Sequence, residues 1–239
     1  MNEASNTPQS DRPADSRERF LGYPVRRRPL ELAGGPLVLY GPANFEELID
    51  DPTVLRRFEA DEFLPYWAEF WPGCLLLADL VESWPATNTD GRRLSLLELG
   101  AGLGLVGLVA SRRGFRAMVS DYDDDALAFV RLSAERNQIP APETRFVDWR
   151  LTYPDLQFDR IVGAEVLYEK RHLEPVAQFI ANHLTRDGAA AICDANRQTA
   201  DGFPDAALRA GLSVAVAARS REYDGRTIQG RVFTLKLAD

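Results

Sequence analysis

From residue 92 onward, short apolar runs alternate with longer segments whose apolar residues recur at helical spacing. Short runs bounded by glycine or aspartate are typical of buried strands, and longer periodic segments are typical of helices. The runs predict strands at 94–99, 116–120, 144–147, 158–163, 189–193, 212–218 and 228–237. The segments between them predict helices at 105–113, 124–137, 170–184 and 199–210.

This alternation predicts an α/β fold, because strands separated by helices form parallel βαβ units. Asp187-Gly188 is expected to form the turn into the fifth strand, whereas Asp224-Gly225 joins the last two strands directly. Because so short a connection joins antiparallel neighbours, the last strand is expected to run against the strand before it. We therefore expect a three-layer, Rossmann-like sheet of seven mostly parallel strands, with the last antiparallel, plus an N-terminal extension.

The first part of the chain follows a different pattern. Residues 1–19 are polar and lack large apolar side chains, which predicts a disordered tail. The next residues predict a hairpin at 25–40 around Gly34-Gly35, a short helix at 44–50, an aromatic-dense linker at 63–71 and a helix from Pro72 to about Ser83. The chain is thus expected to divide into a tail (1–19), an extension of hairpin and helix (20–85) and a cofactor-binding domain (86–239).

Composition excludes several function classes. The 239 residues carry a net charge of −8, with a pI near 5.0, so a general binder of DNA or RNA is not expected, because phosphate neutralisation supplies most non-specific affinity. Two cysteines and two histidines are too few for a disulfide scaffold or a usual zinc site, and no metal is expected. The chain has no apolar run long enough for a signal peptide or membrane span, so we expect a cytoplasmic protein without a membrane partner.

The segment Glu98-Leu-Gly-Ala-Gly-Leu-Gly104 lies between a predicted strand and a predicted helix. Glycines at this place let the backbone turn tightly and approach a ligand closely. Asp121 follows the next strand, where a carboxylate can accept hydrogen bonds from ribose hydroxyls. Two cofactors fit this pattern, S-adenosylmethionine and a dinucleotide, since residues 102–107 also match the G-x-G-x-x-G fingerprint.

Three features favour S-adenosylmethionine. Glu98 precedes the glycines and would repel a pyrophosphate but attract an ammonium or sulfonium group. The loop begins near residue 100 rather than near the start of the chain, where dinucleotide domains often begin. Asp148-Trp149, after the third strand, offers a carboxylate to an adenine amino group and a flat ring beside it.

The residues from 97 to 107, LELGAGLGLVG, resemble motif I of class I (seven-stranded) S-adenosylmethionine-dependent methyltransferases. The similarity covers about residues 62–239 and is greatest to the protein lysine methyltransferase branch that includes the electron transfer flavoprotein β-subunit lysine methyltransferases. The segment PYWAEFWPG at 65–73 is similar to the PYWAxxWPGG segment of that group, and FDRIVGAEVLY at 158–168 is similar to FDLILGADxxY. Asp194-Ala-Asn-Arg197 resembles a DPGR-type turn.

The chain departs from these patterns at three places: Glu165 replaces the commoner aspartate, Cys74 replaces the second glycine of WPGG, and Ala195-Asn196 replace Pro-Gly. The resemblance implies that Glu165 and Tyr168 are the catalytic residues, with Glu165 orienting an incoming amine. The candidate cofactor-binding residues are Trp71, Glu98, Gly100, Gly102, Gly104, Asp121, Tyr122, Asp148, Trp149 and Ala164. Trp67 is a candidate for either the pocket or the core.

The function expected from these residues is methyl transfer from S-adenosylmethionine to a lysine of a partner protein. A methyltransferase acting on a small molecule is one alternative. A methyltransferase-like domain that binds cofactor or a partner without turnover is the other, motivated by Cys74 and Asn196. The sequence leaves open the identity of the substrate, the oligomeric state, and whether the hairpin dimerises the protein, caps the site or contacts the substrate.

Overall fold

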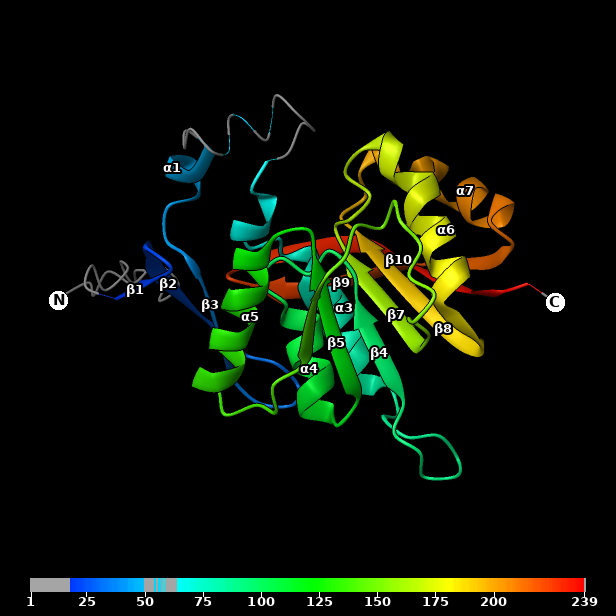
Figure 1. Ribbon diagram of the computed structural model, residues 1–239, viewed down its shortest axis with the longest axis horizontal. Coiled ribbons are helices and arrows are strands. Elements are labelled where there is room, and N and C mark those ends of the chain that lie inside the picture. Colours follow the sequence, from blue (N-terminus) through cyan, green and yellow to red (C-terminus); the bar gives the residue numbers. More distant parts are fainter. Residues whose placement is uncertain (1–17, 50–53, 55, 57, 59–63, 239) are drawn as a thin grey trace, which may run out of the picture.

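A seven-stranded sheet lies at the centre of the computed structural model, which describes residues 18–49, 54, 56, 58 and 64–238 (Figure 1). In chain order its strands are β4 (Ser95–Glu98), β5 (Arg116–Asp121), β6 (Glu143–Phe146), β7 (Phe158–Ala164), β8 (Leu184–Asp194), β9 (Leu212–Tyr223) and β10 (Arg226–Leu237). Across the sheet the order is β6-β5-β4-β7-β8-β10-β9. β10 is antiparallel to β8 and β9, and the other neighbours are parallel, which confirms the predicted sheet.

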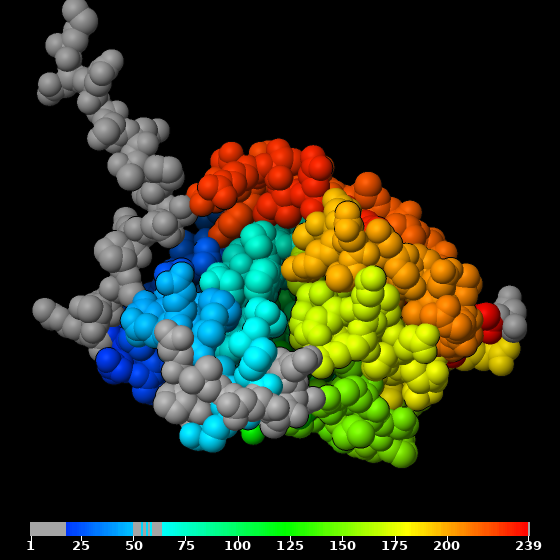
Figure 2. All heavy atoms as spheres, turned by 90° about the horizontal axis from the view of Figure 1, so that it is seen from above, coloured from blue at the N-terminus to red at the C-terminus, as the bar shows by residue number. Residues whose placement is uncertain are grey.

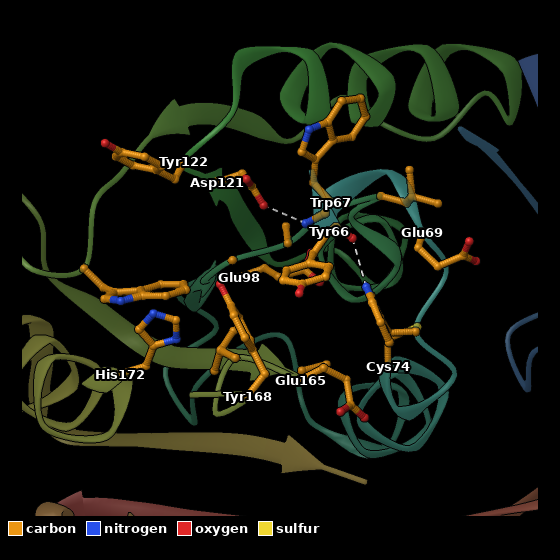
Figure 3. Close-up of a pocket in the computed structure, with 18 of the residues that line it drawn as sticks. Tyr66, Trp67, Glu69, Cys74, Glu98, Asp121, Tyr122, Glu165, Tyr168 and His172 are labelled. Atoms are coloured by element: carbon orange, nitrogen blue, oxygen red, sulfur yellow. Dashed lines mark hydrogen bonds between the residues drawn. The ribbon is translucent and has the colours of Figure 1, made fainter. Parts of the chain in front are cut away.

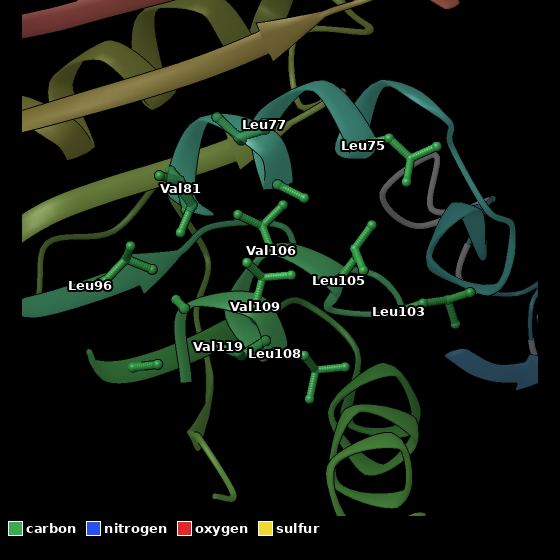
Figure 4. Close-up of a cluster of buried hydrophobic side chains, with 14 of the residues drawn as sticks. Leu75, Leu77, Val81, Leu96, Leu103, Leu105, Val106, Leu108, Val109 and Val119 are labelled. Carbon is green, nitrogen blue, oxygen red and sulfur yellow. The ribbon is translucent and has the colours of Figure 1, made fainter. Parts of the chain in front are cut away.

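Helices cover both faces of this sheet, as a three-layer fold requires (Figure 1). One face packs against α3 (Gly73–Ser83), α4 (Leu105–Arg113) and α5 (Asp124–Arg136), and the other against α6 (Leu173–His183) and α7 (Phe203–Arg209). Fully buried aliphatic side chains of α3, α4 and the strands interlock beneath the first layer (Figure 4). Short 3₁₀ helices lie at η1 (Tyr66–Ala68), η2 (Lys170–His172) and η3 (Gln198–Gly202).

The N-terminal extension forms a small antiparallel sheet of β1 (Arg19–Phe20), β2 (Tyr23–Leu30) and β3 (Leu37–Pro42), followed by α1 (Phe45–Ile49). This confirms the predicted hairpin and short helix. The free edge of β3 lies along α5. There the Asn137 side chain bonds both the N–H and the C=O of Val38, at 2.8 and 2.7 Å, and the Ser133 hydroxyl accepts from the Tyr40 N–H at 3.1 Å.

The structure corrects some predicted boundaries. Asp187-Gly188 lies inside β8 rather than in a turn before it. Phe158 of β7 pairs with Leu184 of β8, and Arg160 pairs with Ala189. The extra residues of β8 between these two pairs form an irregularity in the strand pairing rather than a loop. The predicted helices at 170–184 and 199–210 each begin with a 3₁₀ turn, and Pro72 is the N-cap of α3 rather than its first residue.

The predicted disordered tail lies outside the described residues except for Glu18, whose carbonyl accepts the Val25 N–H at 3.0 Å, and Arg19, which belongs to β1. The division at residues 85 and 86 stays a prediction. Within the described part of the chain, no helix combines the length and the apolar character needed to cross a membrane. Viewed from above, the segment with η1 and the start of α3 lies between the N-terminal strands and the segment that follows β7 (Figure 2).

Candidate functional site

A single cavity of about 780 Å³ is lined by all twelve residues that the sequence singles out (Figure 3). They come from the ends of β4, β5 and β7, from the loops that follow β4, β5, β6 and β7, and from the segment before α3. The cavity therefore lies where the carboxyl ends of the parallel strands meet, which is the place where open α/β sheets bind ligands. The structure thus brings the twelve residues together at one cavity, while their roles remain proposals.

The glycine loop forms one wall of the cavity through its backbone. Gly100, Gly102 and Gly104 have φ values of 60°, 53° and 73°, which lie in the left-handed region that side chains disfavour. Gly104 is the N-cap of α4. The carbonyl oxygen of Trp67 would lie only 3.2 Å from a Cβ atom at Gly102, so η1 packs directly on the loop.

Glu98 has a different environment from the one that the sequence argument assumed. Its two carboxylate oxygens accept hydrogen bonds from the backbone N–H groups of Val106 and Gly107, at 3.3 and 2.6 Å. Burial raises the pKa of Glu98 to about 8 despite these bonds. The side chain thus stabilises the first turn of α4, and its value as a free anion that attracts a sulfonium is reduced.

The same contacts decide between the two cofactors. In dinucleotide-binding folds the first turn after the glycine loop holds a pyrophosphate. Here Glu98 already occupies the amides of Val106 and Gly107. A Cβ atom at Gly107 would lie 2.2 Å from Val119 and 2.7 Å from Glu98, so the third glycine of the fingerprint serves internal packing. The residues present do not fit a pyrophosphate at this turn.

Asp121 ends β5 and faces the glycine loop. Its Oδ2 accepts the Gly102 N–H at 2.8 Å, and the residue lines the cavity. Burial raises the pKa of Asp121 to about 7. A carboxylate in this position can accept bonds from vicinal hydroxyls, so the residues here fit the ribose of a nucleoside cofactor.

The end of the cavity beyond Asp121 is aromatic. Tyr122 packs on Phe146 with ring centroids 5.0 Å apart, and Trp149 lies edge-on to His172 at 5.3 Å. The Asp148 carboxylate, which was expected to face an adenine amino group, accepts hydrogen bonds from the backbone and side-chain N–H groups of Arg150 at 2.9 Å. The flat rings of Tyr122 and Trp149 beside the Asp148 carboxylate, which is already bonded to Arg150, still fit a purine base.

At the opposite end, Glu165 follows β7 in a left-handed conformation with φ of 61°. Its side chain is only 5% exposed, and its Oε2 forms an ion pair with Arg197. The other oxygen, Oε1, is buried and has no hydrogen-bond partner among the described residues. It lies beside Gly73, where a Cβ atom would stand 1.7 Å away.

Tyr168 and Trp71 lie near Glu165 as part of a row of rings. Tyr66 is edge-on to both, with centroid distances of 5.5 Å to Tyr168 and 6.0 Å to Trp71. Burial raises the pKa of the Tyr168 phenol, which therefore stays protonated. Trp71 is 37% exposed, and its Nε1–H donates to the Tyr66 carbonyl at 2.9 Å. An acceptor could pass this partly open rim of the cavity to reach Glu165.

Several lining residues were not assigned to the site by sequence reasoning, among them Tyr66, Cys74, His172 and Arg197. The Asp-x-x-Arg spacing of 194–197 was a usable signal for Arg197, because it resembles a family turn. Trp67 lines the cavity and also belongs to the core, since its ring packs against Phe129 at 5.9 Å. In the described residues, no three His, Cys, Asp or Glu side chains gather as metal ligands would.

The two departures that raised doubt preserve the local backbone. Asn196 has φ of 63°, and asparagine is one of the residues that tolerate this glycine-like conformation. Cys74 lies within α3, where no glycine is needed. Gly73, whose missing Cβ makes room for Glu165, is retained.

Comparison with known proteins is consistent with this geometry. The family model described as lysine methyltransferase matches residues 68–203. The protein N-lysine methyltransferase METTL21A of Xenopus tropicalis is 33% identical over 107 residues, covering 42% of this chain and 47% of that protein. EEF1A lysine methyltransferase 3 of Mus musculus is 31% identical over 122 residues, covering 49% of this chain and 49% of that protein. The histone-arginine methyltransferase METTL23 of Xenopus laevis is 29% identical over 117 residues, covering 46% of this chain and 49% of that protein. The matched part of the chain thus spans about half the length of these relatives.

Solved structures share the fold. A TehB-like SAM-dependent methyltransferase from Corynebacterium glutamicum superposes with a TM-score of 0.52 at 18% identity, covering 77% of this chain and 95% of that chain. A putative RNA methyltransferase from Pyrococcus horikoshii gives 0.52 at 12% identity, covering 68% and 80%. At these identities the similarity extends to the architecture and not to the substrate.

Proposed function

This chain belongs to the lysine methyltransferase family, and we propose that it transfers a methyl group from S-adenosylmethionine to a lysine side chain of a partner protein. The observation that carries the proposal is the single cavity in which the glycine loop and Asp121 occupy one end and Glu165 and Tyr168 the other. The expected cytoplasmic location and a partner protein with an accessible lysine belong to the same proposal, with no nucleic-acid substrate.

The residues proposed to hold the cofactor follow the cavity from end to end. The backbone of Gly100–Gly104 would lie against it, Asp121 would accept its ribose hydroxyls, and Tyr122, Asp148 and Trp149 would surround its base. Ala164 and Trp71 would border its reactive end. When bound, S-adenosylmethionine supplies a methyl group on a sulfonium, which a neutral amine can displace in line.

The residues proposed to act on the acceptor do so by positioning. Displacement needs no nucleophile from the protein, so the site must align the amine and provide suitable electrostatics. The unpartnered Oε1 of Glu165 would accept an N–H of the acceptor amine and stabilise the positive charge that develops on it. The rings of Tyr66, Tyr168 and Trp71 would flank the methylene stem of a lysine and exclude water from it.

Transfer of tritiated methyl groups into a cell lysate tests the proposal. Wild-type protein is compared with Glu165→Gln and Asp121→Ala, and with the matched control Asp155→Asn, which changes an exposed carboxyl group that does not line the cavity. We expect a labelled protein band with wild type and the control, and little or none with the two site variants. Hydrolysis of the band to amino acids then identifies methyl-lysine.

Each other outcome removes a defined part of the proposal. Label in small molecules alone would support a small-molecule methyltransferase, and methyl-arginine would correct the acceptor. Calorimetry with S-adenosylmethionine and with S-adenosylhomocysteine tests the cofactor directly, and failure of both to bind would remove it. Binding without any label would leave a domain that holds the cofactor without turnover.

A further inference from the structure

Arg197 joins three parts of the acceptor end that are distant in sequence. It follows β8, and its guanidinium forms an ion pair with Oε2 of Glu165 at the end of β7. The same group lies 3.4 Å from Asp194 Oδ2, and its Cζ is 5.8 Å from the centroid of the Trp71 ring. No role for Arg197 was derived from the sequence.

Arg197 is itself held on its own side of the cavity. Its backbone N–H donates to Asp194 Oδ1 at 2.8 Å, and its carbonyl oxygen accepts from Arg231 at 2.7 Å. Arg231 also reaches Asp201 at 2.7 Å. The guanidinium therefore approaches Glu165 from a fixed turn and contacts only one of the two carboxylate oxygens. Oε2 is engaged, while Oε1 remains buried and without a partner among the described residues.

We propose that Arg197 is a positioning residue for the acceptor amine, because it holds one oxygen of Glu165 and leaves the other to receive the amine N–H. This inference rests on the proposed methyltransferase function. An unsatisfied buried carboxylate oxygen is costly, so the arrangement is completed when a donor arrives. Gly73 makes room for Oε1 itself, since a Cβ at this position would lie 1.7 Å from that oxygen.

The pairing also determines which form of the amine the site prefers. A Glu165 that stayed ionised without Arg197 would favour a lysine ammonium, which cannot attack. With Arg197 in place the two side chains sum to zero charge, and the bias toward the charged amine is reduced. Burial and then Asp194 raise the pKa of Glu165, whereas the Ala195 N–H lowers it, and the thiols of Cys193 and Cys74 also face the group. Removal of Arg197 should therefore place a proton on Glu165.

Carbon-13 NMR of protein labelled at glutamate Cδ tests this without requiring turnover. The Glu165 resonance is assigned by its loss in Glu165→Gln and is titrated with S-adenosylhomocysteine bound. We expect Arg197→Met to raise the Glu165 pKa by about one pH unit or more, and Arg197→Lys to restore at least half of that change. Arg209→Met, which removes an exposed arginine paired with Glu174, is the matched control and should leave the pKa unchanged.

Titration with n-butylamine, the lysine side chain without its backbone, tests the acceptor step. We expect it to shift the Glu165 resonance in wild type and Arg197→Lys, and to bind at least about fivefold more weakly to Arg197→Met. Arg197→Gln is measured in parallel, since its amide can keep the bond to Asp194 if the methionine variant fails to fold. Equal butylamine affinity and an unchanged Glu165 pKa in either folded variant would overturn the proposal. Failure of the methyl-transfer assay alone would instead overturn the proposed function.

Discussion

Cofactor affinity should depend on the protonation of Asp121. Its carboxylate accepts the Gly102 N–H at 2.8 Å and is proposed to accept the ribose hydroxyls with its remaining lone pairs. A protonated carboxyl group loses acceptor capacity, so the ionised form should bind. Burial raises the pKa of Asp121 to about 7, which brings this change into an accessible pH range.

The size of the effect follows from that pKa. With a pKa of about 7, roughly one half of Asp121 is ionised at pH 7 and about one tenth at pH 6. If the ionised form alone binds, the dissociation constant should rise about fivefold between pH 7 and pH 6, and approach about tenfold per pH unit below that. The direction is a loss of affinity on acidification.

Isothermal calorimetry with S-adenosylhomocysteine between pH 7.5 and pH 5.5, chosen roughly to bracket the Asp121 titration, measures this. The neutral sulfur of that ligand removes the attraction of a sulfonium from the result. Asp121→Asn is the control, since its amide does not titrate, and its affinity should be weaker but nearly constant. A wild-type affinity that does not change with pH, or an asparagine variant with the same slope, would refute the reasoning.

Three further predictions concern folding. Gly73→Ala places a Cβ 1.7 Å from Glu165 Oε1. It should lower the free energy of unfolding in urea by about 1–2 kcal/mol, because overpacking outweighs the gain in helix propensity. Cys74→Ala on the same turn is the control, and an unchanged free energy for Gly73→Ala would contradict the clash. Asn196→Ala should be about 1 kcal/mol less stable than Asn196→Gly because of the positive φ, and equal melting curves would show that the turn relaxes. Burial raises the folded-state pKa of Glu98 from 4.5 to about 8. The contribution of Glu98 to stability is therefore complete below pH 4.5 and is lost as the pH rises toward 8. The difference in unfolding free energy between wild type and Glu98→Gln, measured in urea across this range, should show that loss, and a constant difference would oppose it.

The local pattern was sufficient for the strands and for the position of the cavity. Buried parallel strands are marked by short apolar runs, and their carboxyl ends meet at one edge, so Glu98, Asp121 and Glu165 could be brought together from their order alone. The ends of the predicted helices were also set by local chemistry. Gly114 closes α4, and Trp84 ends α3 before a proline.

The partners of the charged groups could not be predicted in the same way. Glu165 and Arg197 are 32 positions apart, and their contact depends on the pairing of β7 with β8. Glu98 was taken as a free anion because its sequence neighbours do not reveal that α4 begins against its carboxylate. The interior of β8 was misread at Asp187-Gly188, since a turn dipeptide can be accommodated by an irregular strand pair when the flanking residues continue to pair.

The contact between β3 and α5 determines how far the chain can be shortened. Asn137 and Ser133 satisfy backbone groups of β3, and the rings of Phe20 and Tyr23 lie on Phe129 of the same helix. A version of the protein beginning at residue 43 would expose Phe129 to water and leave these polar side chains without their partners. A shortened protein for expression or crystallisation should therefore retain everything from Glu18 onward, although the glycine loop lies about 80 residues later in the sequence.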